Sequence, residues 1–271
     1  MKWTESEIEF LRQNYLARGA KWVAEQLHKT PSAVHHKAER LRLLKPRKQI
    51  NMRLFKNIKP DMAYFLGLLW ADGHLSDIKC ELKLVETDMH EIIPLLKRIG
   101  DWGIFLRKPA KSTWKPTVSA VSCNLPFRTF LSEHGYSTKS FLSPTRILNF
   151  IPLRFHPYFW RGYFDGDGCL FIHKAEKWNH GTLSFSGSYE QDWSPLDNLM
   201  KSMGLKHKLS RTRNLKTGHS YSKITLSNKP DLLRFGEFLF GAPASFPSIS
   251  RKKQAFLAFK NRCLAQTEKG E

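Results

Sequence analysis

The sequence lacks the usual marks of a secreted, membrane-bound or zinc-stabilised protein. Its four cysteines are isolated, with no C-x-x-C pair and no histidine at zinc-finger spacing. This pattern predicts neither a disulfide framework nor a structural zinc site, and it favours a reducing compartment. The start, "MKWTESEIEF", lacks the layout of a signal peptide, and no apolar run approaches the length of a membrane span. We therefore expect an intracellular, cytoplasmic protein with no membrane partner.

Acidic residues are also scarce. The chain has 24 Asp and Glu against 44 Lys and Arg, which gives a formal net charge of +20. This excess points to a polyanionic partner such as nucleic acid, although a generally basic surface of the ribosomal-protein type would give the same composition. With 271 residues, 41% of them hydrophobic, the chain is expected to be globular, with one large domain or two ordinary ones.

The first 45 residues predict three short helices. Apolar residues recur at helical spacing, and Thr30 followed by Pro31 is typical of the N-cap and first position of the third helix. The pattern "W-T-x-x-E … A-x-x-L-x-x-T-x-x-A-V-x-x-K-A-x-x-L" resembles helix-turn-helix modules of the Myb-like type. The resemblance implies a recognition helix over 32–43 in the DNA major groove.

Five residues of this predicted helix would then meet phosphates or base edges: His35, His36, Lys37, Arg40 and Arg42. A three-helix protein-docking module with a solvated basic face is the alternative. Residues 46–57 predict a basic linker that is able to lie along a phosphate backbone.

The remainder contains a duplication. "YFLGLLWADGHL" (64–75) pairs with "FWRGYFDGDGCL" (159–170), and further matches follow in the same order at slightly larger offsets. We infer two homologous halves, 58–148 and 149–263, followed by a polar tail, 264–271.

Each half predicts helix, two strands, helix, two strands, helix, and therefore an α+β fold. Each antiparallel sheet would bury one face under helices and leave the other open and basic, so two sheets side by side would form a saddle for duplex DNA. Basic residues that only keep strand edges soluble would give the same pattern. The candidate DNA-binding residues of this region are Lys79, Lys83, Arg107, Lys108, Lys174, Lys208, Arg211, Arg213 and Lys223.

The duplicated helices carry small residues one turn apart. Gly67 and Ala71 form one such pair, and Gly162 and Gly166 form the other. Small residues at this spacing let two helix backbones approach closely, a steric effect best documented in membranes. We therefore expect the two helices to pack against each other through these four residues.

Each of these helices ends in an acid. Asp72 and Asp167 fall in the last turn, where a carboxylate faces the negative end of the helix dipole at a cost of roughly 0.3–1 kcal/mol. The conflict disappears if the two carboxylates hold a divalent cation, and oxygen ligands suit Mg²⁺. Carboxylates with metals inside a basic DNA-binding surface are the parts of a phosphodiester hydrolase.

At these residues the sequence resembles the LAGLIDADG homing endonucleases. The nine-residue signature matches "FLGLLWADG" (65–73) and "WRGYFDGDG" (160–168), and the likeness covers about 58–263. The resemblance implies a single-chain monomer of two pseudo-twofold αββαββα halves that cuts both strands of a long DNA target and leaves short 3′ overhangs. It also implies metal binding by Asp72 and Asp167, with the carbonyls of Ala71 and Gly166 as further ligands, and Mg²⁺ as cofactor with Mn²⁺ as substitute.

The resemblance further implies a basic residue beside the site in each half. The first half offers Lys139, and the second offers Arg251 or Lys252, between which the sequence does not choose. At the sixth motif position the copies differ, with Trp70 in the first and Asp165 in the second. We interpret this difference as packing variation.

The favoured prediction is a free-standing, Mg²⁺-dependent, site-specific DNA endonuclease, encoded by a mobile gene of a phage or bacterium. A transcription regulator without catalysis on the same fold, or an intron maturase that binds RNA, are the alternatives. The two retained acids disfavour the first alternative, and the DNA-type front module disfavours the second.

Overall fold

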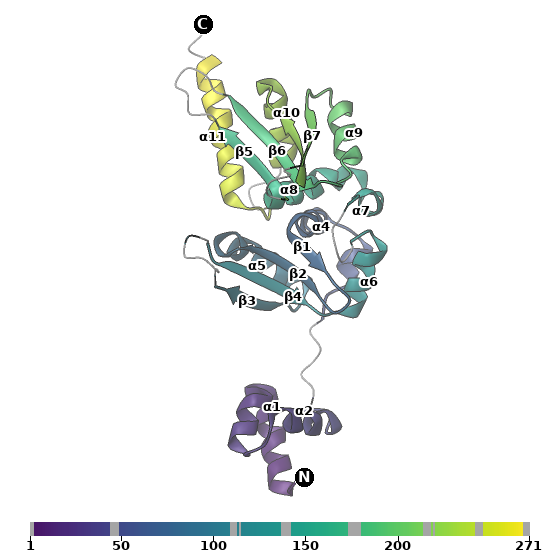
Figure 1. Cartoon of the computed structure of the whole chain (residues 1–271), viewed down its shortest axis with the longest axis vertical. Coiled ribbons are helices and arrows are strands. Elements are labelled where there is room, and N and C mark those ends of the chain that lie inside the picture. The colour runs from purple at the N-terminus through teal and green to yellow at the C-terminus, as the bar shows by residue number, and fades with distance from the viewer. Residues whose placement is uncertain are drawn as a thin grey trace. The chain divides into compact units, whose positions relative to one another are not determined.

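The computed structural model describes residues 3–43, 49–108, 113, 115–136, 142–172, 180–213, 218, 220–241 and 246–267 (Figure 1). The chain forms two compact units, Met1–Gln49 and Ile50–Glu271. Among the described residues, no helix is both long and apolar enough to cross a membrane. Two predicted site residues, Lys139 and Lys174, lie outside the described residues.

The first unit consists of α1 (Glu5–Gln26) and α2 (Pro31–Arg40) around a small apolar core. Gly19, at φ 81°, divides α1 into two helical segments, so the unit holds three. Thr30 caps α2 by accepting a hydrogen bond from the Ala33 N–H at 3.2 Å. The helix predicted over 32–43 ends at Arg40, because Arg42 adopts a left-handed conformation (φ 55°) that turns the chain out of the helix.

The second unit contains two halves that share the order αββαββα. The first half comprises α3 (Arg53–Lys56), α4 (Pro60–Asp72), β1 (Gly73–Leu75), β2 (Cys80–Val85), α5 (Glu86–Ile99), β3 (Gly103–Arg107), β4 (Thr117–Ser122) and α6 (Leu125–Glu133). The second comprises α7 (Thr145–Phe150), η1 (Leu153–Phe155), α8 (His156–Asp167), β5 (Gly168–Ile172), β6 (Gly181–Ser188), α9 (Ser194–Ser202), β7 (Lys208–Arg213), β8 (Ser220–Leu226), α10 (Lys229–Phe240) and α11 (Ser250–Thr267). The predicted α+β fold of two αββαββα halves is confirmed, with short helices and the long α11 added to it.

Each half has a four-stranded antiparallel sheet. The strand orders are β1-β2-β4-β3 and β5-β6-β8-β7, so the two sheets have the same topology. In the first sheet, Leu82 lies opposite Ala120, and both are buried on the face that α4 and α5 cover. The neighbouring pair, Lys83 and Ser119, lies on the other face. This alternation follows from the two-residue period of a strand and separates core from surface.

The cores of the two halves are continuous. Helices α4 and α8 pack against each other between the sheets, and the buried side chains of both halves form a single apolar cluster (Figure 1). The cluster is rich in aromatic rings, such as Phe65 against Phe127 in the first half and Phe164 against Phe185 in the second. The second unit is therefore built around the α4–α8 pair, which carries the predicted site.

Candidate metal and nucleic-acid site

Glycines set how closely α4 and α8 approach. A Cβ atom built on Gly67 would lie 1.9 Å from the Phe159 carbonyl oxygen, and one on Gly162 would lie 2.0 Å from the Tyr64 carbonyl oxygen. Both contacts are with backbone, so a side chain at either position would force the two helices apart. Glycine is therefore required at both positions, and the two helix backbones touch there.

One turn further on, the C-terminal ends of the helices meet. A Cβ on Gly166 would lie 2.3 Å from the Ala71 Cβ and 2.7 Å from Asp72 Oδ2. Asp72 and Asp167 are the last residues of α4 and α8, and Gly73 and Gly168 then begin β1 and β5. The close helix contact thus brings both carboxylates to one place.

The two carboxylates are in an unfavourable environment. Burial, opposed chiefly by Lys252, raises the pKa of Asp72 to about 6. Burial, reinforced by the charge of Asp72, raises the pKa of Asp167 to about 7. Within the part of the chain that the structure describes, neither carboxylate accepts a hydrogen bond or forms an ion pair. The negative charge of the site is therefore only partly compensated.

Lys252 supplies one fixed positive charge beside these acids. Its Nζ donates hydrogen bonds to the carbonyl oxygens of Phe164 (2.7 Å), Gly166 (2.8 Å) and Gly168 (2.7 Å) at the end of α8. A cation there is favoured by the negative end of the helix dipole. Burial lowers the pKa of Lys252 to about 8, against the opposing charges of three aspartates.

Arg251, the other candidate basic residue, points to a different partner. Its guanidinium donates to both oxygens of Asp88 on α5, with Nη2–Oδ2 at 2.6 Å. Successive helix residues project about 100° apart, so the adjacent residues Arg251 and Lys252 reach different neighbours. Of the two, Lys252 is the one at the paired carboxylates.

The available ligands fit a hard cation. Among the described residues, no group of three or more His, Cys, Asp or Glu is placed to hold a metal ion. A cation here would depend on the carboxylates of Asp72 and Asp167 and on main-chain carbonyls such as those of Ala71 and Gly166, with water or phosphate completing the shell. Mg²⁺ binds in this way, with few carboxylates and several other oxygens. The Gly166 oxygen has a second lone pair besides the one that Lys252 uses.

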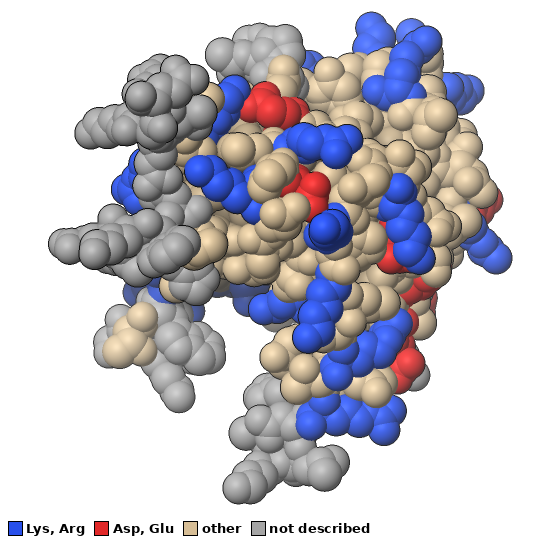
Figure 2. All heavy atoms as spheres, turned by 90° about the horizontal axis from the view of Figure 1, so that it is seen from above, with Lys and Arg blue, Asp and Glu red and all other residues tan. Residues whose placement is uncertain are grey.

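The open face of the first sheet is basic and also carries an acid. Lys83 and Arg107 lie on it, and Glu81 forms an ion pair with Lys79 and lies 3.9 Å from Arg107. Lys108 follows β3 and is exposed. Figure 2 views the protein from above relative to Figure 1, and Lys and Arg outnumber Asp and Glu on the face that it shows.

In the second sheet, the strand register divides the predicted DNA-binding residues. Lys208 and Lys223 lie on the open face, since their cross-strand partners are Thr225 and Ser210. Arg211 and Arg213 lie opposite Ser222 and Ser220, on the other face.

Both of these arginines contact the segment after β6. The guanidinium of Arg211 donates to the carbonyl oxygens of Tyr189 and Gln191, and that of Arg213 stacks over the Tyr189 ring at 4.4 Å. Their assignment to the DNA surface stays a prediction. In the structure, both side chains bind the segment after β6.

In the first unit, four of the five predicted recognition residues lie on α2, and Arg42 lies just beyond its end. His35 Nδ1 is 2.8 Å from the Tyr15 hydroxyl, His36 is paired with Glu39, and Lys37 lies over the Trp3 ring. Arg40 and Arg42 are exposed. Their contact with DNA stays a prediction.

No protein-family model matches the chain, and no curated protein resembles it in sequence. Solved structures that share its architecture include two that are bound to DNA. The LAGLIDADG meganuclease I-AabMI, bound to uncleaved DNA, superposes with a TM-score of 0.52 at 12% identity over 78% of this chain and 93% of that one. I-SmaMI, bound to an uncleaved DNA target in the presence of calcium ions, gives 0.50 at 12% identity over 79% and 93%.

The fold is the LAGLIDADG fold. At 12% identity the likeness extends to the fold alone. The two "D-G" helix ends of this chain therefore belong to the helix pair at the centre of a LAGLIDADG fold, and the chemistry must be inferred from the residues present there.

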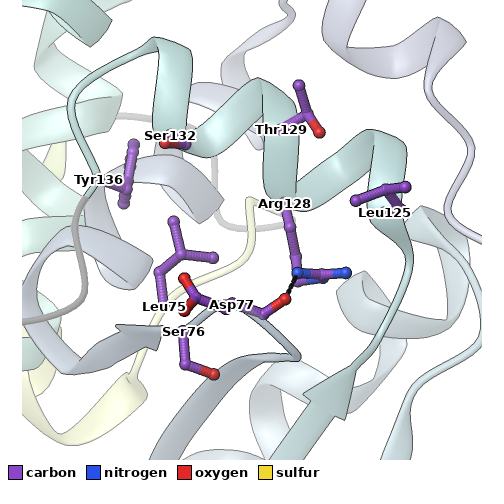
Figure 3. Close-up of a pocket in the computed structure, with 8 residues that line it drawn as sticks. All are labelled: Leu75, Ser76, Asp77, Leu125, Arg128, Thr129, Ser132 and Tyr136. Carbon is purple, nitrogen blue, oxygen red and sulfur yellow. Dashed lines mark hydrogen bonds between the residues drawn. The ribbon is translucent and has the colours of Figure 1, made fainter.

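Two cavities lined by described residues lie away from the paired carboxylates. Figure 3 shows one of about 240 Å³ between the β1–β2 turn and α6, where Arg128 donates to the Asp77 carbonyl oxygen and ties the turn to the helix. A second, of about 700 Å³, is apolar and lined by α3, α6 and Phe150. Neither is lined by Asp72 or Asp167.

Sequence reasoning missed three acids near the site. Asp165, interpreted as packing variation, is fully buried, and its Oδ2 accepts hydrogen bonds from the Tyr64 hydroxyl (2.7 Å) and the Ile249 N–H (2.9 Å). Asp88 and Glu91 on α5 bind the start of α11. No local signal marks these contacts, because each joins residues more than 80 positions apart.

Proposed function

We propose that this protein is a site-specific double-strand DNA endonuclease that hydrolyses phosphodiester bonds with a divalent metal and leaves short 3′ overhangs. One observation carries the proposal. Two largely buried carboxylates without hydrogen-bond or ion-pair partners among the described residues meet at adjoining helix ends. The pKa values of both carboxylates are raised, chiefly by burial. Strongly shifted pKa values of this kind are typical of functional sites.

In the proposed site, Asp72 and Asp167 hold the metal, with the carbonyls of Ala71 and Gly166 as further ligands. Mg²⁺, for which Mn²⁺ substitutes, would supply a Lewis acid and an activated water. Lys252 keeps a positive charge beside the scissile phosphate and offsets part of the acids' repulsion. Lys139 is the proposed counterpart in the first half.

The open sheet faces are the proposed duplex-binding surface. Lys79, Lys83, Arg107, Lys208 and Lys223 would neutralise phosphates and so make affinity depend on salt. Polar side chains between these basic residues would read the base sequence, because contacts with phosphates carry no sequence information.

The proposed domain organisation has a DNA-binding module at 1–45, a basic linker at 46–57, LAGLIDADG halves at 58–148 and 149–263, and a tail at 264–271. The structure corrects two of these bounds, because Ile50 and Phe55 are buried in the core of the second unit and α11 continues to Thr267. The module would extend the DNA footprint beyond the saddle. The four basic or histidine residues His35, His36, Lys37 and Arg40 would supply its contacts, with Arg42 at the end of the helix.

Cleavage of a randomised plasmid library tests this function. Wild-type protein, Asp167→Asn and a control, Glu133→Gln on an exposed position of α6, are incubated with Mg²⁺, and the DNA ends are sequenced. We expect discrete ends with 3′ overhangs from the wild type and the control, and none from Asp167→Asn. If none of the three cuts under conditions where all bind DNA, the endonuclease proposal fails and a DNA-binding regulator takes its place.

A further inference from the structure

The start of α11 belongs to the second half but is bound by the first. Glu91 Oε2, on α5, accepts hydrogen bonds from the Ser250 N–H (2.9 Å) and from the Ser250 hydroxyl. The next residue, Arg251, is held by Asp88 through a two-oxygen contact. A carboxylate at a helix N-terminus satisfies an N–H that has no partner within the helix, and it is favoured by the helix dipole.

A third carboxylate holds the residue before this helix. Asp165, on α8, accepts the Ile249 N–H, and the Tyr64 hydroxyl from α4 binds the same oxygen. Both Asp165 and Ile249 are buried. Arg161, one turn earlier on α8, places its guanidinium over the Phe246 ring at 5.2 Å and so packs the segment that leads to this point.

These contacts bind three consecutive residues immediately before Lys252. Ile249 is held by Asp165, Ser250 by Glu91 and Arg251 by Asp88. A lysine side chain loses much of its rotamer entropy when it is fixed. The contacts of residues 249–251 fix the backbone just before Lys252, and this places Lys252 Nζ within reach of all three carbonyls at the end of α8.

We propose that Asp88, Glu91 and Asp165 are positioning residues that fix Lys252 at the paired carboxylates. Because Asp88 and Glu91 lie on α5, the position of Lys252, a residue of the second half, then depends on the first half. The catalytic consequence rests on the proposed endonuclease function, whereas the positioning itself does not. Displacement of a site group by about 1 Å can reduce a rate on the order of 100-fold.

The spectroscopic test uses the full-length protein without DNA. An ammonium group buried on three carbonyls exchanges its protons slowly, so ¹⁵N NMR should show a lysine side-chain signal that is absent in Lys252→Met. We expect this signal to disappear in Asp88→Asn/Glu91→Gln and to persist in Arg98→Ala. That control breaks a different α5 ion pair, with Asp61 on α4, which does not involve α11.

Glu91→Gln alone is the second variant, because Glu91 is exposed and its replacement leaves the core unchanged. We expect it to weaken the Lys252 signal or broaden it beyond detection. A signal of wild-type intensity in both variants, or no such signal in the wild type, overturns the proposal.

The kinetic test uses a cleaved DNA target. We expect the double variant to lower kcat about 10- to 100-fold with KM nearly unchanged, and to have no further effect in a Lys252→Met background, since it acts through that lysine. An equal loss in both backgrounds overturns the positioning role. If wild-type protein cuts no DNA, the proposed function fails, and the NMR result still decides the positioning of Lys252.

Discussion

Asp72 and Asp167 are held together by the helix contact although their charges repel. Neither residue is favoured at this place by itself, since a carboxylate at a helix C-terminus is unfavourable. Their position follows from the glycines one turn and more upstream. The acids are therefore expected to lower the stability of the metal-free protein whenever both are ionised.

The burial of these acids, together with this repulsion, predicts how stability depends on pH. The folded state raises the pKa of Asp167 from its ordinary 3.8 to about 7 and that of Asp165 to about 6, so the folded protein binds more protons than the unfolded chain between about pH 4 and pH 7. Stability should therefore fall as pH rises through this range. Lys252, with its pKa lowered from 10.5 to about 8, acts in the opposite direction only above about pH 8.

Thermal unfolding of metal-free protein measures this effect. We expect Tm to decrease from pH 5 to pH 8, and the decrease to be smaller in Asp167→Asn, which cannot ionise. Glu133→Gln, on an exposed helix position, should follow the wild type. A wild-type Tm that rises steadily over this range would contradict the assigned direction.

Binding of a divalent metal should reverse this loss of stability at pH 8. A ligand that binds only the folded state stabilises it by about 2.7 kcal/mol at 100 times its Kd. We expect Mg²⁺ or Mn²⁺ to raise the Tm of the wild type and to leave Asp72→Asn/Asp167→Asn unchanged. An equal rise in both proteins would place metal binding elsewhere.

At the scale of elements, α4 and α8 were predictable because their signals are local and occur twice. A helical apolar pattern, small residues four apart and a terminal "D-G" are all readable within nine residues, and their repetition excludes chance. The succession of helices and strands along each half followed from the same repetition. Helix α11 was not predicted to bind α5, because Ser250 and Glu91 are 159 positions apart and no pattern links them.

The register of β7 was a second feature that the sequence did not determine. Whether Arg211 faces DNA or the helices depends on a shift of one residue in β7, and charge pattern alone does not fix that shift. The choice between Arg251 and Lys252 depended in the same way on the rotation of one helix about its axis. Both questions needed three-dimensional coordinates of neighbouring elements.

The glycine contact gives a prediction for the helix pair. In Gly162→Ala the new methyl group would lie 2.0 Å from the Tyr64 carbonyl oxygen, so the helices must separate. Overpacking of this kind typically costs about 1–3 kcal/mol. We expect a loss of about that size or larger in chemical denaturation, and a loss of cleavage as the carboxylates move apart. Glu133→Ala, an exposed helical control, should change stability by less than about 0.5 kcal/mol.

At the scale of the molecule, charge is spread over two units with separate parts in the proposed function. Deleting residues 1–45 removes the proposed helix-turn-helix module and leaves the helix pair intact. We expect weaker DNA binding and a shallower dependence of log K on log salt concentration, by about 0.9 for each phosphate that the module would neutralise. Cleavage at high enzyme concentration should remain, and its complete loss would contradict this division.

The contact between α4 and α8 has a consequence for how the two halves could be recombined. Because the halves join through buried backbone and shared aromatic rings, covalent continuity between α6 and α7 is not what holds them together. Residues 1–136 and 142–271 expressed as separate chains should find each other and restore one site. Each fragment alone supplies one aspartate, so breakage of DNA would report that both are present in the same cell.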